Sequence, residues 1–430
     1  MKNLNIVNES GQAPEPKIKA MFQTIWTGLG DALAAMPRWE RSFHVFWLLG
    51  PFILLIERSP ADIWLSFLAI AFVVRSIFKR DGAWLRVFWV RACFLFLAVC
   101  MLSSAVSAMP SYAFSEGLAW FRFPLFAMAT AFWLGTDKRL LYAMLVSTAL
   151  GMFLMTGILT AEMIMEGQKG GRLSWPYDDL VSGNYLSKVG LPAFTIMVAL
   201  AVGAKPKLAS IMGGLSLISI IMSFLTGERI NFLIRACCGM LAALVWQPNW
   251  RRYIILIIVE IFAVVAVFIT MPNVQDRFTN AVLNSLPTGS HSDYYRVMGG
   301  GLSVFETAPV LGIGPATHRE LCPSILGETL EFRCDNHPHN YYIQFLTETG
   351  VIGLITGSVM IISIIWAAFA GWRQNRANVV AATAFVIPFG LFFPIQSTGD
   401  FFGQWNNIFM WSAIALALAA ARTLVPHKPK

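Results

Sequence analysis

The sequence carries little charge for its length. Only 13% of its 430 residues are Asp, Glu, Lys or Arg, whereas soluble domains carry roughly a quarter. Hydrophobic residues make up 56% of the chain, and they are gathered in blocks close to the ~20 residues that a membrane-spanning helix needs. This composition excludes an ordinary soluble protein and predicts an all-α, polytopic membrane protein.

Several other features are missing, and each absence excludes a class of protein. The first forty residues have no apolar core with a cleavage site, so we expect a cytoplasmic tail over 1–40 and not a signal peptide. No internal repeat is visible, which weakens a transporter interpretation. The sequence has no His-Glu-x-x-His pattern and no carboxylate cluster beside its histidines, so we predict neither a metal nor a cofactor.

Cysteines are few, with six in the chain. Four of them lie in apolar blocks, where a cysteine is usually a small buried residue, namely Cys93, Cys100, Cys237 and Cys238. The other two, Cys322 and Cys334, lie twelve positions apart in one polar stretch. If that stretch faces an oxidising compartment, we expect a disulfide; two independent thiols are the alternative.

Twelve apolar blocks predict about twelve transmembrane helices, nine within 41–270 and three within 351–421. In chain order they are Phe43–Ile56, Ile63–Phe78, Val87–Ser104, Leu118–Leu134, Leu140–Thr160, Leu186–Val202, Leu208–Leu225, Ile230–Trp246, Tyr253–Thr270, Val351–Ala370, Val379–Ile395 and Trp405–Ala421. Between the ninth and tenth blocks lies a polar stretch, 271–350, in which we expect helices.

Basic residues are concentrated in alternate loops, and this pattern sets the orientation. Five such loops are Lys79–Arg91, Thr136–Arg139, Lys205–Lys207, Trp250–Arg252 and Arg373–Arg376. The positive-inside rule places them in the cytoplasm together with both termini, 1–40 and 422–430. The 271–350 stretch is then a large periplasmic loop. The net charge of +8 is explained by topology, and no nucleic-acid partner is implied.

An arginine at the outer edge of the eighth block is a candidate binding residue. Arg229 lies in the short turn Thr226–Arg229, where its planar guanidinium could bind a diphosphate. The plainer alternative is an arginine that extends to the lipid headgroups. Arg235, deeper in the same block, is expected to be structural, paired with Glu228 or Glu260.

The large loop contains a second candidate arginine. Arg296 lies in a helix expected over Ser292–Glu306, where a solvated surface role is the default. The glycines at Gly299–Gly301 either weaken that helix or allow another backbone to approach closely. The segment Pro309–Pro315 predicts a turn that fixes the large loop in place. Its Gly-x-Gly alone is only a weak signal for phosphate binding.

The strongest candidate site is His337-Pro338-His339-Asn340, immediately before Tyr341–Gly350, which leads into the tenth block. A histidine that faces a polar outer cavity can take a proton from a hydroxyl near neutral pH. We therefore expect His339 to be a general base. The alternatives are a metal site formed by His337 and His339, and a purely structural role.

In order along the chain, these pieces resemble the O-antigen ligase and polymerase superfamily of bacterial inner-membrane proteins. The turn Thr226–Arg229 resembles the family's arginine turn, although Glu228 stands where a serine is common. Arg296 followed by Pro309–Gly314 resembles its loop arginine and Pro-Gly-Gly signature. The closest match is His339–Gln344 through Glu348–Leu354, which resembles its histidine motif.

The resemblance implies an enzyme, an O-antigen ligase of lipopolysaccharide biosynthesis that acts at the periplasmic face of the inner membrane. It would transfer a polysaccharide from undecaprenyl diphosphate to a hydroxyl of lipid A–core, by metal-independent inverting glycosyl transfer. Arg229 and Arg296 would bind the diphosphate, and His339 would activate the acceptor. Further substrate contacts are expected from Arg122, Lys188, His337 and Asn340.

Three other functions stay open. An O-antigen or exopolysaccharide polymerase and a protein O-oligosaccharyltransferase belong to the same superfamily, and they would use the same kind of lipid-linked donor. A lipid-linked sugar transporter belongs to a different class. It would also have about twelve spans, but it should show repeats and more ionisable residues near mid-membrane.

Overall fold

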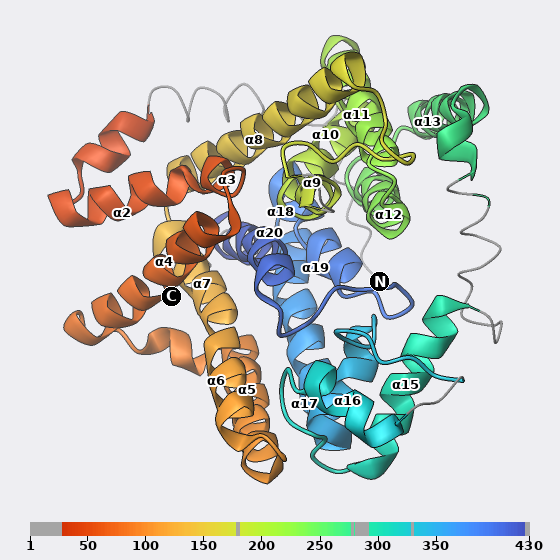
Figure 1. The fold of residues 1–430 in the computed structure, drawn as a ribbon. Helices are drawn as coiled ribbons and strands as arrows, with labels where there is room; N and C mark the ends of the chain where they lie inside the picture. Colours follow the sequence, from red (N-terminus) through yellow and green to blue (C-terminus); the bar gives the residue numbers. More distant parts are fainter. Residues whose placement is uncertain (1–27, 178–180, 277–278, 280–291, 328–330, 426–430) are drawn as a thin grey trace, which may run out of the picture.

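The computed structural model describes residues 28–177, 181–276, 279, 292–327 and 331–425. Within these residues the chain is built from helices, with no β-strand (Figure 1). The predicted all-α class is confirmed. The loop between the ninth and tenth blocks does contain helices, as expected.

The helices before the loop, in chain order, are α2 (Arg38–Leu48), α3 (Gly50–Ile53), α4 (Arg58–Phe78), η1 (Ala83–Arg86), α5 (Phe88–Val106), α6 (Pro110–Trp120), α7 (Arg122–Ala129), η2 (Thr130–Leu134), α8 (Lys138–Met165), α9 (Val181–Asn184), η3 (Tyr185–Val189), α10 (Leu191–Gly203), α11 (Pro206–Leu225), α12 (Arg229–Val245) and α13 (Trp250–Thr270). The loop holds α15 (Asp293–Thr307) and α16 (His318–Leu326). After it come α17 (Tyr341–Gln374), α18 (Val379–Thr383), α19 (Val386–Leu391) and α20 (Gln404–Thr423).

Each of the twelve apolar blocks lies mainly on one helix or on two or three consecutive helices. In the described part of the chain, seven helical segments are long and apolar enough to cross a membrane, and α9–η3 with α10 forms an eighth that is bent by 56°. The other four blocks lie in α2–α3, α12, α18–α19 and α20. These four blocks differ from the membrane-length segments because they are interrupted or contain polar residues, such as Arg229 and Arg235 in α12. The protein is an all-α polytopic membrane protein.

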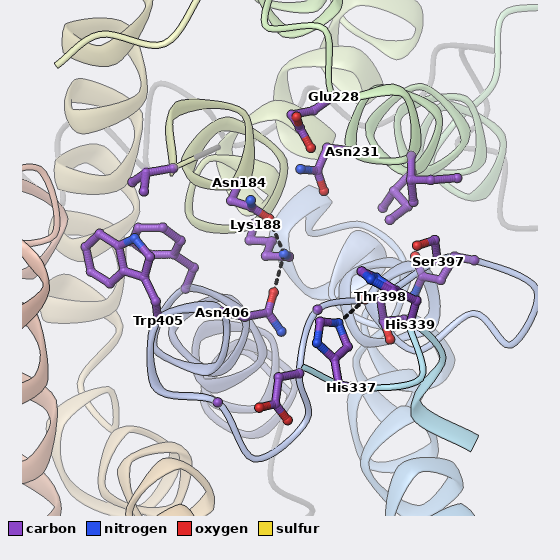
Figure 2. A pocket seen from close by; sticks show the side chains of 18 of the residues that line it. Asn184, Lys188, Glu228, Asn231, His337, His339, Ser397, Thr398, Trp405 and Asn406 are labelled. Atoms are coloured by element: carbon purple, nitrogen blue, oxygen red, sulfur yellow. Dashed lines mark hydrogen bonds between the residues drawn. The ribbon is translucent and has the colours of Figure 1, made fainter. Parts of the chain in front are cut away.

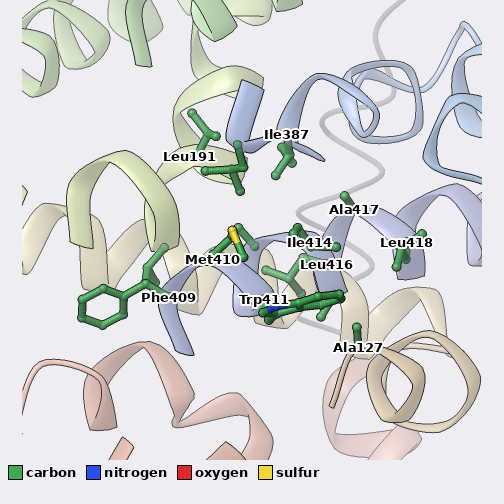
Figure 3. Packing of buried hydrophobic residues seen from close by; sticks show 14 of the residues in the cluster. Ala127, Leu191, Ile387, Phe409, Met410, Trp411, Ile414, Leu416, Ala417 and Leu418 are labelled. Atoms are coloured by element: carbon green, nitrogen blue, oxygen red, sulfur yellow. The ribbon is translucent and has the colours of Figure 1, made fainter. Parts of the chain in front are cut away.

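The core is centred on α20, whose residues from Asn407 to Ala421 are all buried. A helix that is buried on every side lies inside the bundle. The Trp411 ring lies edge-on to Trp120 at 6.1 Å between ring centroids and to Phe392 at 6.4 Å. Figure 3 shows Trp411 in this buried helix, together with Met410, Ile414 and Leu416. In contrast, α13 has no buried residue and lies at the periphery (Figure 1).

Two stretches of backbone cross closely where the loop meets α17. Gly350 interrupts α17 with φ 67° and ψ −169°. The Pro309–Pro315 segment lies against this kink, since Val351 N donates to Pro309 O at 2.9 Å and Gly314 N donates to Glu348 O at 2.9 Å. A Cβ on Gly312 would clash with the Glu348 backbone, and one on Gly350 would clash with Val310 O. The segment seats the loop, as its sequence predicts.

The loop helices are tied to each other and to the segment that carries the histidines. The helix expected over Ser292–Glu306 forms one residue further on, as α15. Cys322 in α16 forms a disulfide with Cys334, with 5.7 Å between their Cα atoms. This bond anchors the segment that leads to His337 and His339.

The crossing predicts a strong effect of Gly350→Ala on stability. Alanine would have to adopt a left-handed conformation and would clash with Val310 O, so we expect a loss of at least ~2 kcal/mol or a failure to fold. Gly157→Ala is the matched control, because a Cβ there meets no atom within 4 Å and the substitution favours the helix by about 1 kcal/mol. Thermal unfolding of both variants in detergent tests this, and equal melting temperatures would contradict it.

Candidate active site

A cavity of about 710 Å³ opens among the ends of several helices (Figure 2). Its lining comes from segments that are far apart in the sequence. Arg58 begins α4, Arg172 and Lys188 lie before α10, and Arg229 begins α12. The large loop adds Tyr294, Arg319, Asn336, His337 and His339, and the 391–409 segment completes the wall. The cavity therefore exists only in the folded chain.

Positive charge predominates in this cavity. Five lysine or arginine side chains line it, against the two carboxylates of Glu228 and Asp400. The basic residues are Arg58, Arg172, Lys188, Arg229 and Arg319. Each carboxylate has an arginine partner, Arg172–Glu228 at 3.5 Å and Arg319–Asp400 at 3.6 Å. An excess of cations in a partly enclosed site favours an anionic ligand.

Lys188 is the most deeply placed of these cations. Its side chain is buried in the π-helical turn η3, and its ammonium donates to the side-chain oxygens of Asn184 and Asn406. Asn406 in turn donates to the Tyr341 hydroxyl at 2.8 Å. These amide partners are neutral, so they orient the ammonium without neutralising it. A buried charge of this kind is stabilised further by an anion.

Arg229 reaches the cavity because the turn before it is tight. Gly227 has φ 69°, a conformation that favours glycine, and α12 begins two residues later at Arg229. Arg229 therefore lies at the amino end of a membrane-type helix, and with Glu228 and Asn231 it lines the cavity. The tight turn thus brings Arg229 to the same cavity as Lys188.

Arg235 is structural, as expected, but the predicted carboxylate partners were wrong. It is fully buried, and its guanidinium donates to the Leu186 carbonyl and the Ser219 hydroxyl. It also lies over the Phe194 ring, 4.2 Å from the centroid. A carbonyl, a hydroxyl and an aromatic face replace the carboxylate, because Glu228 is taken by Arg172.

The two histidines lie next to each other on one wall of the cavity, with their ring centroids 4.3 Å apart (Figure 2). His337 Nε2 lies 3.0 Å from the Thr398 carbonyl, which can only accept, so Nε2 carries the proton. Burial, followed by the nearby His339, lowers the pKa of His337. His337 is therefore neutral at pH 7, and both histidines line the cavity.

His339 has an unusual backbone conformation. Its φ is 54°, which is rare for a residue with a side chain and often accompanies functional sites. The conformation is held by Thr398 N, which donates to His339 O at 2.8 Å. On its other sides the ring meets Asp335 Oδ2 at 3.4 Å and lies edge-on to Tyr294 at 5.9 Å between centroids.

The glycine run in α15 explains how the histidine segment is positioned. A Cβ on Gly300 would lie 2.7 Å from Arg333 O, and one on Gly301 would lie 2.8 Å from Pro338. A Cβ on Gly299 would clash with Phe332. The helix continues through all three glycines. Their function is therefore to let the 332–338 segment approach α15 closely.

Three predicted contact residues are not among the side chains that line the described cavity. Asn340 is the N-cap of α17, and its amide donates to the Pro394 and Gln396 carbonyls. Arg122 pairs with Asp62 at 2.9 Å. Arg296 lies on α15 beyond Tyr294, and its carbonyl accepts from Arg333 N. The structure thus brings together Lys188, Arg229, His337 and His339.

Several cavity residues were missed by motif reasoning. They include Arg58, Arg172, Asn406 and Trp405. The signal that could have found Arg58 and Arg172 was topological, because both lie in loops that the basic-residue pattern assigns to the outer side. Asn406 gave no such signal, since it lies within an apolar block.

The described residues contain no group of three or more His, Cys, Asp or Glu side chains that could bind a metal ion. His337 and His339 have Thr398 and Asp335 as their nearest polar partners. The arrangement instead combines an anion-binding cavity with an imidazole on its wall. An anion-binding cavity with an imidazole on its wall can bind a phosphorylated group and accept a proton beside that group.

The comparison with protein families gives one match. Residues 214–357 match the O-antigen ligase family, a range that contains Arg229, Arg296, the disulfide and His339. A search of curated proteins found no match. This match confirms the resemblance seen in the sequence: residues 214–357, about a third of the chain, are similar to the O-antigen ligase family.

Proposed function

We propose that the protein is an O-antigen ligase that transfers a polysaccharide from undecaprenyl diphosphate to a hydroxyl of lipid A–core. The observation that carries this proposal is the cavity, which is lined by the cations Lys188 and Arg229 together with His339. The similarity of residues 214–357 to the O-antigen ligase family supports a glycosyltransferase.

Lys188 and Arg229 would bind the diphosphate of the donor. The diphosphate leaves with the bonding electrons, so negative charge grows on its bridging oxygen during transfer. Cations already in place oppose that charge without reorganisation, which is a large source of catalysis. Arg296 remains a proposed further contact, from the helix whose Tyr294 lines the cavity.

His339 would accept the proton of the acceptor hydroxyl. The hydroxyl oxygen then forms a bond to the anomeric carbon from the face opposite the diphosphate, and the carbon–oxygen bond to phosphate breaks. One direct displacement inverts the anomeric configuration. No metal step is required, because the proton goes to His339 and the leaving-group charge goes to the cationic cavity.

The segments that meet at the cavity support a periplasmic active site. Arg58, Arg172, Arg229, His339 and Thr398 come from five different segments. The basic-residue pattern assigns every one of these segments to the outer face. Their convergence is consistent with a cavity at the periplasmic side of the inner membrane and with both termini in the cytoplasm.

The polymerase and the protein O-oligosaccharyltransferase would need the same donor chemistry, so the cavity alone does not choose between the three enzymes. Deletion of the gene separates them, with envelope glycolipids resolved on a gel. A ligase predicts bare lipid A–core and accumulated lipid-linked polymer, because finished chains can no longer be joined. Core that carries a single repeat would indicate a polymerase, and an unchanged ladder would remove both.

His339→Asn tests the general base. Asparagine tolerates a left-handed backbone but cannot accept a proton near pH 7, so we expect kcat to fall by about 10²–10⁴-fold with little change in melting temperature. Purified protein, lipid-linked donor and lipid A–core are used for the measurement. Glu320→Gln, an exposed change on α16 of the same loop, is the control. Near wild-type activity of His339→Asn would exclude the role, and loss of activity with EDTA would support a metal instead.

Lys188→Met tests the diphosphate contact. Methionine keeps an unbranched side chain and removes the charge. The loss of one charged hydrogen bond costs about 1.5–3 kcal/mol, so we expect the donor KM to rise roughly 10–100-fold, while the acceptor KM changes little. Lys207→Met, an exposed lysine at the start of α11, is the control. An unchanged donor KM and kcat in Lys188→Met would show that the donor binds elsewhere.

A further inference from the structure

The carboxylate of Asp335 is held in place on the side of His339. Its Oδ1 accepts from Asn336 N at 2.9 Å, which fixes the orientation of the carboxylate. Its Oδ2 then faces His339 Nε2 at 3.4 Å and Arg333 Nη2 at 3.5 Å. The cavity lining includes His339 but not Asp335. The carboxylate therefore contacts the imidazole without being part of the cavity lining.

We propose that Asp335 is the positioning residue for His339, which fixes its tautomer and stabilises the imidazolium that forms when the acceptor loses its proton. This rests on the proposed function, in which His339 is the base. Asp335 does not contact the substrate in this arrangement. It acts through the histidine.

The tautomer follows from the donor and acceptor inventory. An ionised carboxylate only accepts hydrogen bonds, so His339 Nε2 must carry the proton that faces Asp335. Nδ1 is then the nitrogen with the free lone pair, and it is the atom available to accept a proton from the acceptor hydroxyl. A histidine without this partner would divide its population between two tautomers, of which one has no lone pair at Nδ1.

The carboxylate is ionised in the pH range where a histidine acts. Burial alone would raise the pKa of Asp335, but the Asn336 N–H, His339 and Arg333 together lower that pKa below its usual value. When His339 gains a proton, the pair becomes a carboxylate and an imidazolium in contact. This contact stabilises the charged form of the base.

The other charged groups around the two histidines do not replace Asp335. On the loop segment His337 is neutral, and burial lowers the pKa of His318 in α16 to about 4, so His318 is neutral too. Asp400, from the segment before α20, is held by Gln344 and Arg319. Tyr294 from α15 presents a ring, and Arg229 from α12 lies in the cavity wall. Asp335 is the carboxylate in contact with His339.

Asp335→Asn is the central variant, because it keeps the shape and removes the charge. The amide could donate to Nε2 and stabilise the wrong tautomer, so we expect kcat to fall about 10²–10⁴-fold, with the donor KM changed less than threefold. Asp335→Glu should recover part of the activity, since it restores a carboxylate. Asp293→Asn is the matched control, because it removes an exposed carboxylate that also contacts Arg333, at 3.7 Å.

Rescue and folding separate positioning from a structural role. A positioning residue predicts that Asp335→Asn loses activity at an unchanged melting temperature and that Asp335→Glu recovers part of it, while Asp293→Asn keeps wild-type kcat. Loss of activity with a lowered melting temperature and no recovery in Asp335→Glu would overturn the proposal, because it would indicate a structural residue.

The two proposals fail in different ways. If Asp335→Asn keeps wild-type kcat while His339→Asn is inactive, the positioning role is excluded and the general base remains supported. If His339→Asn keeps activity, the proposed mechanism itself falls. Isotope-edited NMR of the His339 ring nitrogens gives a direct readout, because the proton should lie on Nε2 in the wild type and redistribute in Asp335→Asn.

Discussion

The close crossing of the loop backbone over the kink in α17 is the constraint on which the cavity depends. Gly312 and Gly350 leave no room for a Cβ, so two main chains touch where side chains would normally separate them. Backbone hydrogen bonds close the contact on both sides of the kink, from Gly314 N to Glu348 O and from Val351 N to Pro309 O. The large loop is thereby fixed to the membrane bundle at a single register.

A buried carboxylate extends this constraint to the cavity wall. Glu348 accepts from the backbone of Ala316 and His318 and from Gln344, at 3.1–3.2 Å. Gln344 also donates to Asp400 at 2.7 Å and accepts from Phe401 N at 2.8 Å. Satisfied networks of this kind specify one arrangement, because each broken bond leaves a buried polar group unpaired. The loop, α17 and the segment before α20 therefore hold one geometry.

The sequence predicted the helical class, the loop helices and the cavity-lining roles of Arg229, Lys188 and His339, because hydrophobic blocks and loop charges are local signals. It did not predict the partners of Arg235, which are a carbonyl and a hydroxyl from distant helices. Nor did it separate Tyr294, which lines the cavity, from Arg296 two positions later. Which side chains of a loop helix face the cavity depends on packing. In α15 that packing is the close approach of the 332–338 segment to the Gly299–Gly301 run.

The left-handed conformation of His339 follows from the same packing. A positive φ costs roughly 1–3 kcal/mol for a residue with a side chain, so the surroundings must fix it. Pro338 packs against Gly301 on one side, and Thr398 N and the Asn340 cap fix the backbone on the other. The ring then lines the cavity and contacts Asp335, which is not part of the lining. A regular helical start at this position would place the imidazole elsewhere, so the strain and the glycine run together account for how a base comes to face a cationic cavity.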